Sequence, residues 1–183
     1  TYAQSTIRAQ FSDALYDSGL FRNPQFKNLT DRAIAAMEEL NAREPYEPRN
    51  YIRLIETYSD YAKRDPSYFA QAEGYARRAV ELAPNRQGVL YHLAFVLAGQ
   101  GKYEEAFTVA RRAVDVSPRV YKSQYQLGII YSVYADSAGV KGTSAQREYR
   151  KKAKDQFEKA WNMAGEQNDY EFFLLYDFNN IVT

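Results

Sequence analysis

The sequence predicts an all-α fold, a solenoid of short helical hairpins stacked in chain order, and three observations support this. Pro84 and Pro118 lie 34 residues apart, the length of one helix-turn-helix repeat. Between them, apolar and small residues recur at helical spacing in two segments. Each of the six prolines falls in a segment expected to connect helices, where a missing N–H costs little.

The stretch between those two prolines predicts a pair of helices. The first covers residues 88–98, has an apolar stripe on one side and is ended by glycines. The second covers residues 103–116 and carries small residues on one side, so that its backbone can approach the first closely. The stripe is Leu90, Leu93, Ala94 and Leu97, the glycines are Gly99 and Gly101, and the small residues are Ala106, Ala110 and Ala113.

The second helix recurs along the chain. Ala106 precedes the closing Pro118 by 12 residues, and residues 33–45, 72–84 and 153–165 repeat this interval from an alanine to a proline or glycine. Leu40, Ala79 and Ala160 then occupy the intermediate close-packing position. We therefore expect one domain over residues 1–183, with repeats at about 1–47, 48–86, 87–120 and 121–167 and an unpaired terminal helix at 168–181.

This pattern resembles the tetratricopeptide repeat (TPR) family. The matching positions of the central repeat are Leu93, Gly101, Tyr103, Ala106, Ala113 and Pro118, whereas Ala94 stands where the family usually has Gly. The resemblance implies a right-handed α-solenoid of four helix pairs plus one terminal helix. It also implies a concave groove, lined by the first helix of each pair, that binds a protein or peptide partner.

The first two repeats have recognisable helix signals. Residues 1–16 predict the first helix of repeat one, and we expect Asn28 or Thr30 to cap its second helix. Repeat two begins after Pro48. Asp65, followed by a proline, is expected to start its second helix.

The end of the chain departs from the regular pattern. Repeat four begins at Tyr121, and its long connection, residues 135–144, predicts extended helices joined by a mobile, protruding loop. Thr143 and Gln146 resemble a capping box for the next helix. Residues 168–181 look like the first helix of a fifth repeat and are rich in aromatic residues, which indicates self-association, truncation or folding back; truncation is our preferred interpretation.

Composition excludes several partners. With 24 basic and 23 acidic residues the net charge is +1, so we expect no nucleic-acid partner. No run approaches the roughly 18 apolar residues of a membrane-spanning helix, so we expect a soluble chain without membrane insertion. The chain lacks cysteine, which removes disulfides and thiolate metal sites. Its 17 tyrosines suit both helix packing and ligand grooves.

Candidates for catalysis or metal binding are weak, and we expect no enzyme activity, cofactor or metal. His92 is the single histidine. The adjacent pairs Glu38-Glu39 and Glu104-Glu105 point in different directions on a helix and are expected to be solvated.

Two further motifs favour structural roles over binding. The glycines of residues 139–144 lack the spacing of a phosphate-binding loop. The basic run 147–154 is expected to be a solvated helix surface, since Glu148–Lys152, Lys151–Asp155 and Lys154–Glu158 are i,i+4 acid–base pairs.

The TPR resemblance implies a binding site on the first helices. The groove positions lie two residues before and two after the inward leucine of each first helix. They are Ala9 and Asp13, Ile52 and Glu56, Tyr91 and Phe95, Tyr125 and Ile129, and Phe172 and Tyr176, so the groove is expected to be acidic at its start and aromatic toward its end. Packing of some of these rings against neighbouring repeats is an equally weighted alternative. The lysine and asparagine clamp of the chaperone-binding members is missing.

A second resemblance covers residues 30–118. Pro48-Arg49-Asn50-Tyr51, Asp65-Pro66, Ala72-Glu73, residues 82–87 and Tyr91-His92-Leu93-Ala94 look like the TPR tail of bacterial O-antigen ligase or polymerase-like membrane proteins. This resemblance implies an extracytoplasmic domain of a polysaccharide-assembly protein, whose ligase chemistry would belong to another part. A soluble cytoplasmic TPR adaptor and a glycan-binding module that uses the aromatic groove are the alternatives.

Overall fold

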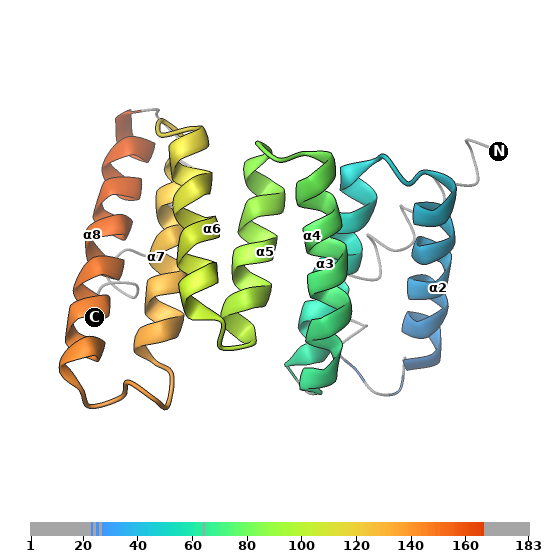
Figure 1. Ribbon diagram of the computed structural model, residues 1–183, viewed down its shortest axis with the longest axis horizontal. Coiled ribbons are helices and arrows are strands. Elements are labelled where there is room, and N and C mark those ends of the chain that lie inside the picture. Colours follow the sequence, from blue (N-terminus) through green and yellow to red (C-terminus); the bar gives the residue numbers. More distant parts are fainter. Residues whose placement is uncertain (1–22, 24, 26, 64, 167–183) are drawn as a thin grey trace. The chain divides into compact units, whose positions relative to one another are not determined.

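The computed structural model describes Asn23, Gln25 and residues 27–63 and 65–166. All regular structure in this part of the chain is helical. The chain divides into two compact units, Thr1–Pro84 and Asn85–Thr183. Within each unit, consecutive helices run side by side, and the connection between α7 and α8 is longer than the others (Figure 1).

The first unit contains α2 (Lys27–Arg43), α3 (Pro48–Ala62), the short 3-10 helix η3 (Pro66–Tyr68) and α4 (Phe69–Leu82). α3 packs against both α2 and α4 and contributes the fully buried Leu54 and Ile55. The buried residues of α4 are Ala72, Ala76 and Ala79. Because these side chains are small, α4 can approach α3 closely.

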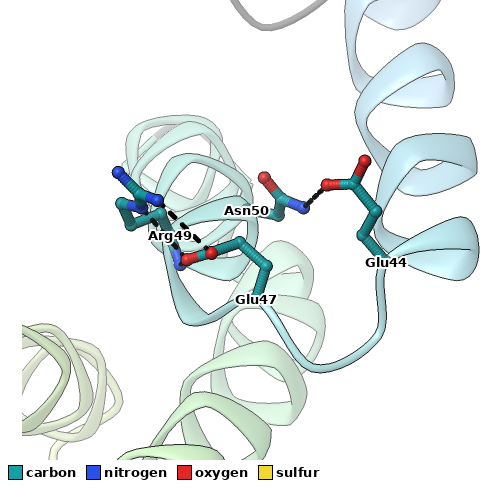
Figure 2. A network of polar contacts seen from close by, with 4 residues as sticks. All are labelled: Glu44, Glu47, Arg49 and Asn50. Atoms are coloured by element: carbon teal, nitrogen blue, oxygen red, sulfur yellow. Dashed lines mark hydrogen bonds and ion pairs between the residues drawn. The ribbon is translucent and has the colours of Figure 1, made fainter. Parts of the chain in front are cut away.

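The connection from α2 to α3 is fixed by polar side chains (Figure 2). Pro48 takes the first helical position, and the Glu47 carboxylate accepts hydrogen bonds from the backbone N–H and the Nε of Arg49, both at 3.1 Å. Asn50 Nδ2 donates to Glu44 Oε2 at 3.4 Å, so the end of α2 is also tied to the start of α3. Glu47 thereby satisfies a backbone donor that a helix start otherwise leaves unpaired.

The second unit contains α5 (Gln87–Gly99), α6 (Tyr103–Val116), α7 (Tyr121–Ala135) and α8 (Ser144–Glu166). α5 packs against α6 and α7, and α7 also packs against α6 and α8. Because α5 and α7 each contact more than one neighbour, both have buried residues on more than one side. The small residues of α6 and α8 lie buried in the helix contacts: Ala106, Ala110, Ala113, Ala153, Ala160 and Ala164.

Gly128 lies at a close contact between α7 and α8. A Cβ atom built on Gly128 would lie 2.6 Å from Phe157 Cε1 and 3.2 Å from the Ala153 carbonyl oxygen. The lack of a side chain at Gly128 thus makes room for the Phe157 ring.

α5 ends in a Schellman motif. The N–H of Lys102 donates to the Leu97 carbonyl at 2.9 Å, and the N–H of Gly101 donates to the Ala98 carbonyl at 3.0 Å. Gly101 has φ 76°, a left-handed conformation that favours glycine. The expected break after residue 98 is therefore made by Gly101, whereas Gly99 is still the last residue of α5.

The connection between α7 and α8 is anchored to α8. Arg150 pairs with Asp136 at 3.0 Å, and Val140 is buried. At the start of α8, Thr143 Oγ1 accepts from the Gln146 N–H at 3.3 Å and Gln146 Oε1 accepts from the Gly142 N–H at 2.7 Å. The predicted capping box is thus present with its return bond shifted by one residue, and α8, at 23 residues against 14 for α6, has the predicted extension.

The sequence-based fold is confirmed as an all-α solenoid of helical repeats, with one local error. α2 begins at Lys27, so neither Asn28 nor Thr30 is the cap residue before the helix, and that prediction is wrong. The Lys27–Asp31 ion pair at 2.6 Å supports the additional first turn. The predicted helices at 1–16 and 168–181 lie outside the described residues, and the single-domain organisation remains a prediction.

Candidate functional site

The predicted groove residues of the second unit lie on two helices in contact. Tyr91 and Phe95 are four residues apart on α5, and Tyr125 and Ile129 are four residues apart on α7. Residues at this spacing lie on one side of a helix, and α5 packs against α7. We call these four residues the α5–α7 face.

Tyr91 joins the two helices through a hydroxyl network. Its hydroxyl lies 2.6 Å from the Ser123 hydroxyl of α7, which also accepts a hydrogen bond from Gln87 Nε2 at 3.2 Å. Ser123 is 1% exposed. Burial raises the pKa of Tyr91, and the hydrogen bond with Ser123 partly offsets this. Ser123 could not be identified from the sequence, because a serine in a helix carries no signal of a partner 32 residues away.

Phe95 is the most accessible apolar side chain of the α5–α7 face. It is 39% exposed, although most of α5 is buried around it. Ile129 is half-buried. An accessible ring beside buried residues can bury further apolar area against a ligand without rearranging the core.

Tyr125 has a largely structural position. Its ring packs against Phe157 of α8, with 5.4 Å between the ring centroids. It also contacts the buried cluster of Tyr121, Ala160 and Ala164. The alternative that some groove rings pack against neighbouring helices therefore describes Tyr125 better than Phe95.

In the first unit, Ile52 and Glu56 are half-buried on α3. The Glu56 carboxylate pairs with Arg53 Nη1 at 3.0 Å. The start of the groove was expected to be acidic. The charge of Glu56 is compensated on its own helix, and Ala9 and Asp13 lie outside the described residues. Phe172 and Tyr176, the last predicted groove residues, lie outside the described part of the chain.

Five tyrosines of the first unit form a chain of ring contacts. The centroid distances are 5.3 Å for Tyr61–Tyr68, 6.0 Å for Tyr58–Tyr68, 5.8 Å for Tyr58–Tyr75 and 6.2 Å for Tyr51–Tyr75. These rings come from α3, η3 and α4. They are thus used in packing these elements together.

Glu38 connects this tyrosine chain to α2. Its Oε1 accepts a hydrogen bond from the Tyr58 hydroxyl at 2.7 Å and another from the Tyr75 hydroxyl at 2.9 Å. Burial and these bonds raise the pKa of Tyr75 to about 12 and raise that of Tyr58 further. The expectation that Glu38 is solvated is wrong, since the half-buried carboxylate bonds to partners on two other helices.

The second unit has its own aromatic cluster. Phe107 lies 5.1 Å from Tyr149 and 5.2 Å from Tyr131 between ring centroids, and Tyr134 lies 4.5 Å from Tyr149. Lys152 Nζ sits 4.1 Å from the Tyr149 centroid, a cation–π contact. These rings join α6, α7 and α8, so they belong to the packing of the second unit.

The remaining motifs show surface or local roles. Glu104 and Glu105 are exposed. In the basic run of α8, Glu148 pairs with Lys152 at 2.6 Å and Lys154 with Glu158 at 3.9 Å. The ion pair expected between Lys151 and Asp155 does not form, although both residues lie in the described helix.

Among the described residues, no group of three or more histidine and acidic residues is arranged to hold a metal ion. None of the described helices combines the length and the apolar character that crossing a membrane requires. His92 is half-buried on α5.

Solved structures with similar folds are TPR proteins. TTC0263 of Thermus thermophilus, a thermophilic TPR protein, aligns with a TM-score of 0.62 and 20% identity over 92% of this chain and 89% of that chain. The MamA RS-1 ArsTM double mutant aligns with a TM-score of 0.50 and 16% identity over 85% of this chain and 96% of that chain. At these identities the similarity concerns the fold, which is TPR-like. No protein-family model and no curated protein matches the sequence.

Proposed function

We propose that this chain is a noncatalytic scaffold that captures a protein or peptide segment on the α5–α7 face. The observation that carries this proposal is the 39% exposure of Phe95 on an otherwise largely buried helix. TPR-like folds are generally suited to protein interaction, and stacked hairpins leave their first helices accessible to a ligand. The face therefore combines a rigid base with an accessible ring.

The rigidity of this face favours binding. Tyr91, Gln87 and Ser123 hold α5 and α7 together through hydrogen bonds, and Tyr125 is held by Phe157. A surface whose side chains are already ordered loses little conformational entropy when a ligand binds. A ligand would thus gain apolar contact at Phe95 and Ile129 at a low ordering cost.

Peptide selection with matched variants tests this function. Peptides would be selected from a random phage-display library on the full chain, and their affinities measured by calorimetry for the wild type, Phe95→Ala and Thr108→Ala. Thr108 is exposed on α6 and serves as the control. We expect Phe95→Ala to weaken binding about tenfold, which corresponds to about 1.4 kcal/mol, and Thr108→Ala to leave it unchanged.

The same experiment separates binding from folding. Circular dichroism should show equal helix content for all three proteins. The proposal fails if no peptide is selected, or if the selected peptides bind Phe95→Ala as tightly as the wild type. Tyr125→Ala is a poorer probe, because loss of its packing on Phe157 lowers stability as well.

The cellular context is a second part of the proposal. The resemblance of residues 30–118 to the TPR tails of O-antigen ligase-like proteins favours the extracytoplasmic side of a bacterial membrane, in polysaccharide assembly. A soluble cytoplasmic adaptor is the alternative. Apolar membrane spans encoded upstream of Thr1 in the full gene would support the first, and a cytoplasmic gene product without spans would contradict it.

A further inference from the structure

We infer that the α5–α7 face selects an uncharged, apolar segment of its partner and discriminates against charged ones. This inference rests on the proposed function and specifies the chemistry of the ligand. It follows from the scarcity of charge on α5 and α7 and from the closure of their polar network.

The two helices carry little charge. α5 contains no Asp, Glu, Lys or Arg among its 13 residues, and α7 contains Lys122 alone among its 15. Half of these 28 positions are buried, where charged residues are rare, and of the 14 accessible ones only Lys122 is charged. Helix α3 of the first unit, by contrast, carries Arg49, Arg53, Glu56 and Asp60. Low charge is thus a property of this face and not of every first helix.

Three polar groups at the contact of α5 and α7, those of Gln87, Tyr91 and Ser123, are engaged with each other. Ser123 is 1% exposed. Its hydroxyl accepts a hydrogen bond from the Gln87 side chain and forms another with the Tyr91 hydroxyl. Lys122, the single charged group, lies with its Nζ 5.8 Å from the centroid of the adjacent Tyr121 ring. A charged ligand group placed over Phe95 would lose hydration. Because α5 carries no charged residue, it offers no opposite charge that could compensate for this loss.

The cost of that desolvation supplies the selectivity. Burying an unpaired charge is much more costly than burying an apolar side chain, because no counter-charge repays the lost hydration. Apolar side chains gain free energy from the same burial. Charged segments should therefore bind the face more weakly than apolar ones, because their lost hydration is not compensated by an opposite charge. Interfaces commonly obtain specificity in this way.

Three synthetic peptides and the full chain test this inference. The first is a neutral peptide of leucine, phenylalanine, alanine and glutamine, and the other two have two of its leucines replaced by aspartate or by lysine. We expect the neutral peptide to bind and both charged versions to bind about tenfold more weakly or worse. The affinity of the neutral peptide should change less than about twofold between low and high salt, since screening acts on charges.

Matched variants at Phe95 and Thr108 test whether the preference for a neutral peptide depends on the α5–α7 face. Phe95→Asp should abolish binding of the neutral peptide, whereas Thr108→Asp, which adds the same charge on α6, should preserve it. Phe95→Gln, which removes the ring without adding a charge, should weaken binding with helix content unchanged. If Phe95→Asp fails to fold, Phe95→Gln still tests whether binding depends on this ring.

The outcomes distinguish this inference from the function on which it rests. If a charged peptide binds through Phe95 as well as the neutral one, or if salt weakens the neutral peptide about tenfold, the inference is overturned and peptide capture stands. If no peptide depends on Phe95, both fail. Sugar binding in calorimetry, or dimerisation in sedimentation experiments, that is lost in Phe95→Gln would assign the face to a glycan or a second copy and would overturn the inference.

Discussion

Glu38 shows how a single carboxylate can organise a unit rich in tyrosine. Its carboxylate accepts hydrogen bonds from the hydroxyls of Tyr58 on α3 and Tyr75 on α4. Glu38, on α2, thus connects three helices. Hydrogen bonds to an ionised acceptor are stronger than neutral ones. The neighbouring Glu39 is exposed and pairs with Arg43 on its own helix.

Replacing Glu38 by glutamine tests this role. Glu38→Gln keeps the side-chain size but removes the charge, so one or both tyrosine bonds weaken; we expect a loss of about 1–3 kcal/mol in the free energy of unfolding. Urea denaturation would measure it. Glu39→Gln is the control and should change stability by less than about 0.5 kcal/mol. Equal effects of the two substitutions would contradict the assignment.

The same tyrosines predict an alkaline decline in stability. Tyr75 has a folded-state pKa of about 12, against about 10 in the unfolded chain. The unfolded chain thus releases its proton first as pH rises. The stabilisation is complete below about pH 10 and is lost as pH rises toward 12.

Urea unfolding between about pH 9 and pH 11 would measure this decline. In Tyr75→Phe the decline should be smaller, because phenylalanine cannot ionise. A Tyr75→Phe protein with the same pH dependence as the wild type would refute the late ionisation of Tyr75.

Residue pairings of this kind could not be read from the sequence. Glu38 stands beside Glu39, and nothing in that dipeptide shows that Glu38 meets tyrosines 20 and 37 residues away. Such contacts depend on the rotation of α2 relative to α3 and α4. The same limit applies to Ser123 and Tyr91.

At the scale of the element, helix lengths and small-residue contacts were predictable. The interval of 12 residues from alanine to proline or glycine located α4, α6 and α8, because a tight helix contact needs small side chains at fixed spacing. α6 begins and ends at the predicted residues, 103 and 116. The start of α2 was missed, since the helix begins at Lys27, ahead of both expected caps.

The α7–α8 contact gives the sharpest prediction at this scale. In Gly128→Ala the new methyl would overlap the Phe157 ring, whose nearest carbon lies 2.6 Å from the Cβ position. We expect a loss of about 1–3 kcal/mol in stability from overpacking, measured by urea denaturation.

Gly74 supplies the control for that substitution. It lies within α4, and apart from its chain neighbours and the nearby backbone of that helix no heavy atom lies within 4 Å of its Cβ position. Gly74→Ala should therefore stabilise the protein by about 0.5–1 kcal/mol through helix propensity. A Gly128→Ala protein as stable as the wild type would show that α7 and α8 are not in close contact at this point.

At the scale of the whole molecule, the candidate site was predictable in outline and not in detail. The spacing around the inward leucines placed Tyr91, Phe95, Tyr125 and Ile129 on the first helices, and the structure puts them on two helices in contact. The sequence could not separate the accessible Phe95 from Tyr125, whose ring packs on Phe157. That distinction depends on side-chain packing between helices.

The low charge of α5 and α7 gives the molecule its expected ligand preference. Net charge is +1 over the whole chain, so long-range attraction contributes little to association. Recognition should then depend on apolar contact at short range. This is why the affinity for a neutral peptide is expected to be nearly independent of salt.

The most direct test is to map the binding surface by nuclear magnetic resonance with the neutral peptide of leucine, phenylalanine, alanine and glutamine. We predict that its addition shifts the amide signals of Tyr91, Phe95 and Ile129 and leaves those of the exposed side of α6, such as Thr108, unchanged. Shifts confined to α6 or α8, or no shifts at a saturating concentration, would contradict capture by the α5–α7 face.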